Sequence, residues 1–243
     1  MLGAVESYKR QFEALARAVE AHPLCEVVQP LTFGAALERA AIDNFADVFS
    51  GLVVPEEVRR FYQVMDGASF FWRARSAIPE ATMSAYNAGS HPTCMDWERT
   101  NGFSIVGIAE LLTAPAFTDL RVTERSPEIL ATVAGPGVSS ETMGQSVRPF
   151  DRHLRHDNED GCVALLMLPD VEARVVGITD SGTIDPKRPW MRLTDYLDYM
   201  IAMCGDQGGR YEFSGLGDLS SGQLRFDAES LTSFRNGILR PLP

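Results

Sequence analysis

The clearest potential for chemistry lies in two short segments of the second half of the chain. The first, Asp180-Ser181-Gly182-Thr183, follows a hydrophobic segment and matches the short signature of an aspartic-protease loop. That chemistry needs two carboxylates that share one proton, and the chain contains no second Asp-Ser/Thr-Gly. The turn preferences of Asp and Gly explain the same residues. A hydrolase that uses the Asp180 loop therefore stands only as an alternative.

The second segment has the residue types of a metal cluster: His153, His156, Asp157, Glu159 and Asp160. Metal ligands must be held on fixed elements by supporting hydrogen bonds, whereas DRHLRHDNEDG has the composition of an exposed loop. Arg152 and Arg155 alternate with the candidate ligands and would oppose a bound cation. We therefore predict a solvated charged loop and no metal site.

Motifs of nucleophilic and phosphate chemistry are not found in the sequence. The start of a Gly-x-Ser-x-Gly elbow at Gly137 is not completed, because Glu141 occupies the position of the last glycine. There is no phosphate-binding loop, and the pair Gly215 and Gly217 lacks the third glycine of a dinucleotide fingerprint. We expect no catalytic residues and no cofactor.

Acidic residues are concentrated in two parts of the chain. Seven acids and three bases lie between Glu26 and Asp66, and five acids and one base between Asp195 and Asp218. The whole chain has 22 Lys and Arg against 33 Asp and Glu, a net charge of −11. Such a field repels nucleic acid and anionic lipid and favours a basic protein partner. Solvated helix faces that meet no partner explain the same acids, so both interpretations stay open.

We expect the partner-binding residues to be acids together with one exposed tryptophan. Trp97 lies between Asp96 and Glu98 in a polar stretch, whereas a tryptophan in a small domain usually belongs to the core. The candidate partner-binding residues are Trp97, Asp157, Glu159, Asp160, Asp195 and Asp198.

Bulk composition is that of an ordinary globular protein, with 243 residues, 45% of them hydrophobic and 23% charged. The four cysteines are scattered without a Cys-x-x-Cys pair, which predicts free thiols and a reducing, cytoplasmic environment. The longest apolar run, Cys162 to Leu168, is too short to span a bilayer, so we expect no membrane partner.

Apolar spacing predicts the elements that must position these residues. Helical spacing occurs over residues 4–21 and 33–49, and an irregular link through Pro30 joins the two. The central stretch is 53–72, in which a helix begins at Pro55 and stops at Gly67, before an aromatic strand that starts at Ser69. The apolar stripe of this helix consists of Val58, Phe61, Tyr62 and Met65.

Further elements follow in the second half of the chain. We predict a strand and a short helical turn over 101–112, and a hairpin that pairs 162–168 with 174–179. A last helix is capped by Thr194 and ended by Gly205. Residues 113–149 are rich in Pro, Gly, Ser and Thr and suggest an insertion, and 206–243 suggest a tail that wraps the surface.

Five elements in order resemble the SUKH superfamily: the helix of VPEEVRRFYQVMDG, the aromatic strand after it, NGFSIVGIAELL, CVALLML and WMRLTDYLDYM. That superfamily includes the Smi/Knr-type cell-wall regulators of fungi and many bacterial immunity proteins. The resemblance covers about residues 53–205. The chain departs from the simplest members in its N-terminal helices, the insertion and the C-terminal tail, which leaves the subgroup open.

The resemblance implies an α+β fold, with a mostly antiparallel sheet packed by helices, an N-terminal helical extension and a C-terminal tail. The expected parts are 1–52, 53–205 with the variable insertion 113–149, and 206–243, in one compact unit. The implied function is non-catalytic binding: an immunity protein that occludes the active or substrate-binding surface of a cognate toxin, such as a nuclease. The alternative is a regulatory scaffold of the Smi/Knr type. No catalytic residues are carried over from the family.

Overall fold

The computed structural model describes residues 3–22, 25–49, 51–74, 101–114, 121–122, 140–156, 159–169, 172–179, 183–184, 191–202 and 204–205. The helices are α1 (Gly3–Glu20), α2 (Arg39–Phe49), α3 (Glu56–Val64), α5 (Ile108–Thr113), α7 (Ser140–Ser146) and α8 (Leu193–Ala202). The strands are β1 (Cys25–Phe33), β2 (Ala68–Ala74), β3 (Asn101–Ile105), β4 (Arg121–Val122), β5 (Val147–His156), β6 (Glu159–Leu166), β7 (Arg174–Thr179), β8 (Thr183–Ile184) and β9 (Met191–Arg192). Across these ranges, no helix combines the length and hydropathy that a bilayer-crossing segment requires.

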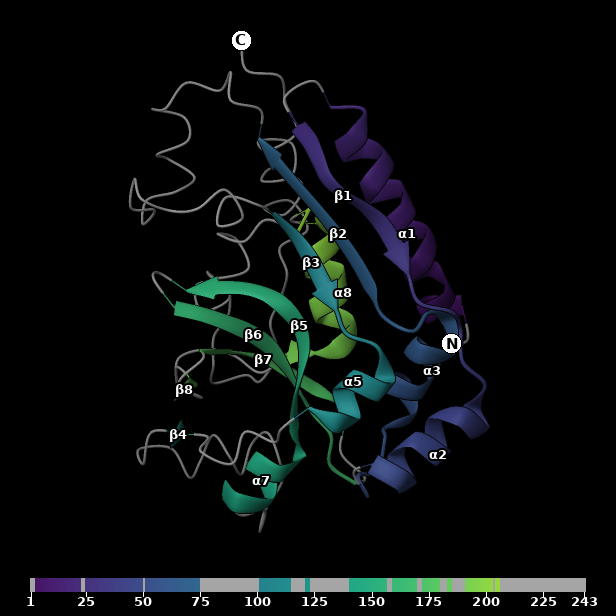
Figure 1. The fold of residues 1–243 in the computed structure, drawn as a ribbon, viewed down its shortest axis with the longest axis vertical. Helices are drawn as coiled ribbons and strands as arrows, with labels where there is room; N and C mark the ends of the chain where they lie inside the picture. The colour runs from purple at the N-terminus through teal and green to yellow at the C-terminus, as the bar shows by residue number, and fades with distance from the viewer. Residues whose placement is uncertain are drawn as a thin grey trace.

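A seven-stranded sheet in the order β1-β2-β3-β5-β6-β7-β9 forms the framework, and every neighbouring pair in it is antiparallel. β4 and β8 form a separate parallel pair. In Figure 1 the strands β1 to β3 run diagonally along the molecule, whereas β5 to β7 turn across it, so the sheet curls like half a barrel. The predicted α+β class with a mostly antiparallel sheet is confirmed, and so is the hairpin of β6 and β7.

The helices α1, α3 and α8 supply buried side chains to the core beside the sheet. α1 runs beside β1 and contacts α3 and α8, and α8 lies behind β3 and β5 (Figure 1). The α1 stripe of Tyr8, Phe12, Leu15 and Val19 is buried, as is the predicted α3 stripe. Helical periodicity therefore identified both buried faces correctly.

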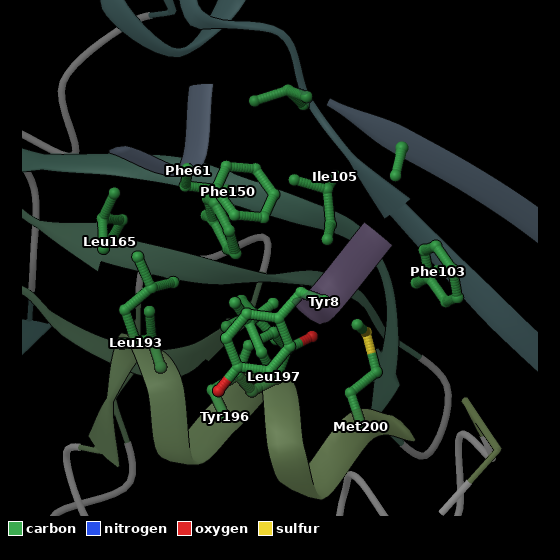
Figure 2. Close-up of a cluster of buried hydrophobic side chains, with 14 of the residues drawn as sticks. Tyr8, Phe61, Phe103, Ile105, Phe150, Leu165, Leu193, Tyr196, Leu197 and Met200 are labelled. Carbon is green, nitrogen blue, oxygen red and sulfur yellow. The ribbon is translucent and has the colours of Figure 1, made fainter. Parts of the chain in front are cut away.

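Aromatic rings join α3, β5 and α8 inside this core. The Phe61 ring meets Phe150 edge-on at 5.8 Å between centroids, and Phe150 meets Tyr196 in the same way at 6.2 Å. Figure 2 shows these three side chains in one interior cluster with Tyr8 and Leu197. Edge-to-face pairs of this kind add to the stabilisation that burial of apolar area provides.

The predicted irregular link through Pro30 is wrong, because residues 25–33 form β1, which pairs with β2. Phe33 ends this strand, and the second helix begins at Arg39. β1 is the outermost strand of the sheet, so a proline that cannot donate a ladder hydrogen bond is tolerated there. Proline and polar residues concealed the strand, although they are typical of a sheet edge.

The predicted exposed loop at 151–161 is also wrong. Residues 151–156 belong to β5 and 159–161 to β6, with Arg155 opposite Asp160 and His156 opposite Glu159. Charged residues there belong to strands because the backbone ladder of the hairpin extends beyond its apolar part. The last residues of the segment 113–149 lie in α7 and at the start of β5, a central strand.

The Asp66-Gly67 pair fixes the turn between α3 and β2. Gly67 has φ +82°, and a Cβ atom there would lie 2.6 Å from the Ile105 carbonyl oxygen. The predicted left-handed glycine is therefore confirmed. Asp66 Oδ1 accepts a hydrogen bond of 2.7 Å from the Ile108 N–H, which caps α5 from a distant part of the sequence.

The segment after α8 docks on β2 and β3. The Trp72 indole N–H donates to the Cys204 carbonyl at 2.8 Å, and the Gly102 N–H donates to the Gly205 carbonyl at 2.8 Å. A Cβ atom on Gly205 would lie 2.8 Å from the Gly102 Cα, so residue 205 must be a glycine for this approach. Trp72 is a core residue, as expected for a tryptophan in a small domain.

Asp151 is fully buried where the two parts of the curled sheet meet. Its Oδ1 accepts a hydrogen bond of 2.8 Å from the Ser104 N–H of β3, and its Oδ2 accepts one of 2.7 Å from the Tyr196 hydroxyl of α8. The register between β3 and β5 places Ile105 opposite Asp151, and the Val106 N–H donates to the Phe150 carbonyl. One carboxylate thus ties β3, β5 and α8 together.

Replacing this carboxylate tests its role in the fold. We expect Asp151→Ala to lower the free energy of unfolding by about 3 kcal/mol, because the Ser104 N–H and the Tyr196 hydroxyl both lose their acceptor. Tyr196→Phe should lower it by about 1 kcal/mol, because only one of the two hydrogen bonds is lost. Urea unfolding followed by tryptophan fluorescence measures both. A loss below about 1 kcal/mol for Asp151→Ala would contradict this role.

Candidate functional site

Charged side chains from four parts of the fold gather around the N-terminal end of α8. We call this set the acidic cluster; it consists of Glu57, Glu172, Arg174, Arg192, Asp195 and Asp198. Glu57 lies in the first turn of α3, Glu172 lies just before β7, and Arg174 begins that strand. The other three lie on β9 and α8. Four acids stand against two arginines, so the cluster is a negatively charged part of the surface.

Arg192 and Asp195 form the most regular ion pair of the cluster. The guanidinium Nε and Nη2 each donate to one carboxylate oxygen of Asp195 at 2.8 Å, in a two-pronged arrangement. Asp195 is in the first turn of α8, where a negative charge is favoured by the helix dipole. α8 begins at Leu193, one residue before the predicted cap Thr194.

Asp198 faces α1 and carries a perturbed carboxyl group. The Tyr8 hydroxyl donates to Asp198 Oδ1 at 2.8 Å and lies 3.1 Å from the Thr194 carbonyl oxygen. Partial removal from water raises the pKa of Asp198, and the charge of Asp195 adds to this effect, while Tyr8 and Arg192 oppose it. Burial also raises the pKa of the Tyr8 hydroxyl.

Glu57 links α3 to the loop before β7. Its carboxylate accepts a hydrogen bond from the Ala173 N–H. Burial raises the pKa of Glu57, and Glu172 adds to this effect, while the Ala173 N–H and the two arginines lower it. Glu172 forms an ion pair of 2.9 Å with Arg174. Both carboxylates with raised pKa values thus accept hydrogen bonds from the chain itself.

The structure brings together two of the predicted partner-binding residues, Asp195 and Asp198. Glu159 and Asp160 begin β6 at the end of the sheet near Thr179, which is five strand steps, about 17 Å, from Arg174 of the cluster. Trp97 and Asp157 lie outside the described residues, and so does Asp180. Among the described residues, no group of three or more His, Cys, Asp or Glu side chains could hold a metal ion.

Sequence reasoning did not assign Glu57, Glu172 or Tyr8 to the site. Glu57 was visible as a helix-start acid, but its contact with Ala173 spans 116 residues of sequence. Local spacing carries no signal for such a contact. The same holds for Tyr8, which has the spacing of a core residue and meets Asp198 through its polar end.

A second exposed feature lies at the end of α2. Val48 and Phe49 contribute to the predicted helical spacing over residues 33–49, but their side chains are 65% and 51% exposed. The buried stripe of α2 is instead formed by Ile42 and Ala46. The Phe49 ring stacks on Phe45 at 5.8 Å between centroids. We call this exposed end of α2 the apolar tip. A few large exposed apolar side chains are common in proteins, so the apolar tip is not by itself a binding site.

Comparisons of the chain with protein-family models, curated proteins and solved structures found no match.

The raised carboxyl pKa values predict a specific pH dependence. A carboxyl whose pKa is raised in the folded state favours folding while it is protonated, and this contribution is lost as the pH rises through the raised pKa. We therefore expect Asp198→Asn to keep or increase the stability at pH 7. The variant should also flatten the decline of stability that begins near the ordinary Asp value of about 4.

Urea unfolding at a series of pH values measures this dependence. Asp47→Asn, which removes an exposed acid of α2, serves as the control and should keep the wild-type profile. A clear loss of stability at pH 7 in Asp198→Asn, together with an unchanged pH slope, would show that the charge on Asp198 stabilises the fold.

Proposed function

We propose that this chain is a non-catalytic binding protein that recognises a basic protein partner through the acidic cluster. The observation that carries the proposal is the convergence of Glu57, Glu172, Asp195 and Asp198 on one surface region from segments far apart in the sequence. Two of these carboxyls, those of Glu57 and Asp198, have a raised pKa. Groups with perturbed pKa values are enriched at functional sites.

The proposed partner is a cognate toxin domain, which this chain neutralises by covering its active or substrate-binding surface. Two features support this choice: the net charge of −11, which favours a basic partner, and the resemblance of the segment order to immunity proteins of the SUKH superfamily. Electrostatic attraction of this kind mainly accelerates association, because it acts before the two surfaces touch.

The first test is capture of the partner. The full-length chain, immobilised and exposed to the proteins of its own cell and to the product of the neighbouring reading frame, should retain one basic polypeptide. Retention of several unrelated endogenous proteins would favour the regulatory scaffold. Retention of none would contradict the proposal.

Association kinetics then test the surface. We expect Glu172→Gln combined with Asp198→Asn to slow association with the captured partner roughly tenfold at low salt, because two negative charges are removed from the cluster. The difference should shrink as salt is added, since exposed charges are screened. Stopped-flow fluorescence at several salt concentrations measures both effects.

A matched control separates local charge from net charge. Glu38→Gln combined with Asp47→Asn removes the same charge from exposed positions before and on α2. This variant should associate at close to the wild-type rate. Equal slowing by the two double variants would show that the acidic cluster has no special role in partner binding.

A further inference from the structure

Arg148 is an arginine in an unusual environment. It is the second residue of β5, opposite Leu165 of β6, and only 8% of it is exposed. Its neighbours along the chain, Ser146 and Val147, are also buried. An arginine is rarely buried to this extent unless it is paired with an acid.

The guanidinium of Arg148 is only partly satisfied by hydrogen bonds. Nη1 donates to the carbonyl oxygens of Gln145 and Val147, the second at 2.9 Å. Nε is buried and has no hydrogen-bond partner. Within the part of the chain that the structure describes, no acid forms an ion pair with Arg148. Loss of water lowers its pKa, but an arginine remains charged in a protein.

Other arginines of the fold show the contrast. The arginines that pair with acids keep at least 20% of their side chains exposed: Arg39, Arg59, Arg60, Arg73, Arg152, Arg174 and Arg192. Arg148 is more buried than any of them and has no counter-ion among the described residues. A buried charge without a partner is strongly unfavourable, so an anion that reaches it would bind with a large gain in interaction energy.

We propose that Arg148 is the receptor of a small oxyanion, a carboxylate or a phosphate, bound through the Nε–Nη2 edge of the guanidinium. Nη1 on the opposite side already serves two carbonyl oxygens, whereas the Nε–Nη2 edge takes part in none of these hydrogen bonds. Two parallel N–H groups match the two oxygens of a carboxylate or phosphate. The ligand must be small, because little of Arg148 is accessible.

Thermal unfolding of the whole chain in matched salts tests this site. Sodium phosphate, sodium acetate and sodium chloride are compared at equal ionic strength and pH. We expect phosphate, acetate or both to raise Tm by about 3 °C over chloride at tens of millimolar. A response to acetate alone identifies a carboxylate ligand, and a response to phosphate alone identifies a phosphate ligand. The absence of any rise over chloride overturns the proposal.

Substitutions assign the response to Arg148. Arg148→Met removes the charge and keeps an unbranched chain, so it should abolish the anion response without lowering Tm in chloride. Arg152→Met is the matched control, because Arg152 is exposed on the same strand and pairs with Glu110 at 2.8 Å. It should keep the full response. A response that persists in Arg148→Met overturns the proposal.

Two further measurements keep the test decisive if Arg148→Met does not fold. Arg148→Lys keeps the charge but lacks the planar two-pronged edge, so it should lose most of the anion response. In the wild-type chain, one arginine Nε–H resonance should shift on titration with phosphate or acetate. If Arg148→Lys responds like the wild type and no arginine Nε–H resonance moves, the proposal is wrong.

Discussion

The buried carboxylate of Asp151 is the constraint on which the rest of this structure depends. The strands β1 to β3 form one part of a curled sheet, and β5, β6, β7 and β9 form the other. The register between the two parts runs through the single pair of Ile105 and Asp151. The same carboxylate accepts the Tyr196 hydroxyl, so the position of α8 is set together with the curl of the sheet. A purely apolar contact at this point would bury surface without fixing how β3 and α8 are oriented relative to β5. Two hydrogen bonds to one buried carboxylate fix the orientation of both elements.

The acidic cluster follows from that arrangement. Because α8 is held against β5 and the segment after it is held by Trp72, its first two turns place Asp195 and Asp198 beside α1 and the start of β7. α3 then brings Glu57 to the Ala173 N–H. Several of these charges are partly removed from water, which raises the pKa of both Glu57 and Asp198. A surface that attracts a basic partner gives a reason to keep four acids close together at this place.

Sequence patterns predicted the parts of the fold in which local chemistry and tertiary packing agree. The stripes of α1 and α3, the left-handed Gly67 and the β6–β7 hairpin belong to this group. β1 was missed because Pro30 argues against a strand anywhere except at the edge of a sheet. Which strand lies at the edge depends on the order of the strands, which local sequence does not reveal. The charged end of β5 was missed because its pairing with β6 depends on a long-range ladder. The cluster and the burial of Arg148 were beyond sequence reasoning, since both arise from contacts between distant segments.

The central claim is that the acidic cluster is the surface on which a protein partner binds. Hydrogen–deuterium exchange of the full-length chain, alone and with the captured partner, tests it most directly. The account predicts that slowed exchange appears in the first turn of α8, at residues 172–174 and in the first turn of α3, while the amides of α2 are unchanged. Slowed exchange confined to the exposed end of α2, around Val48 and Phe49, would contradict it and assign partner binding to the apolar tip instead.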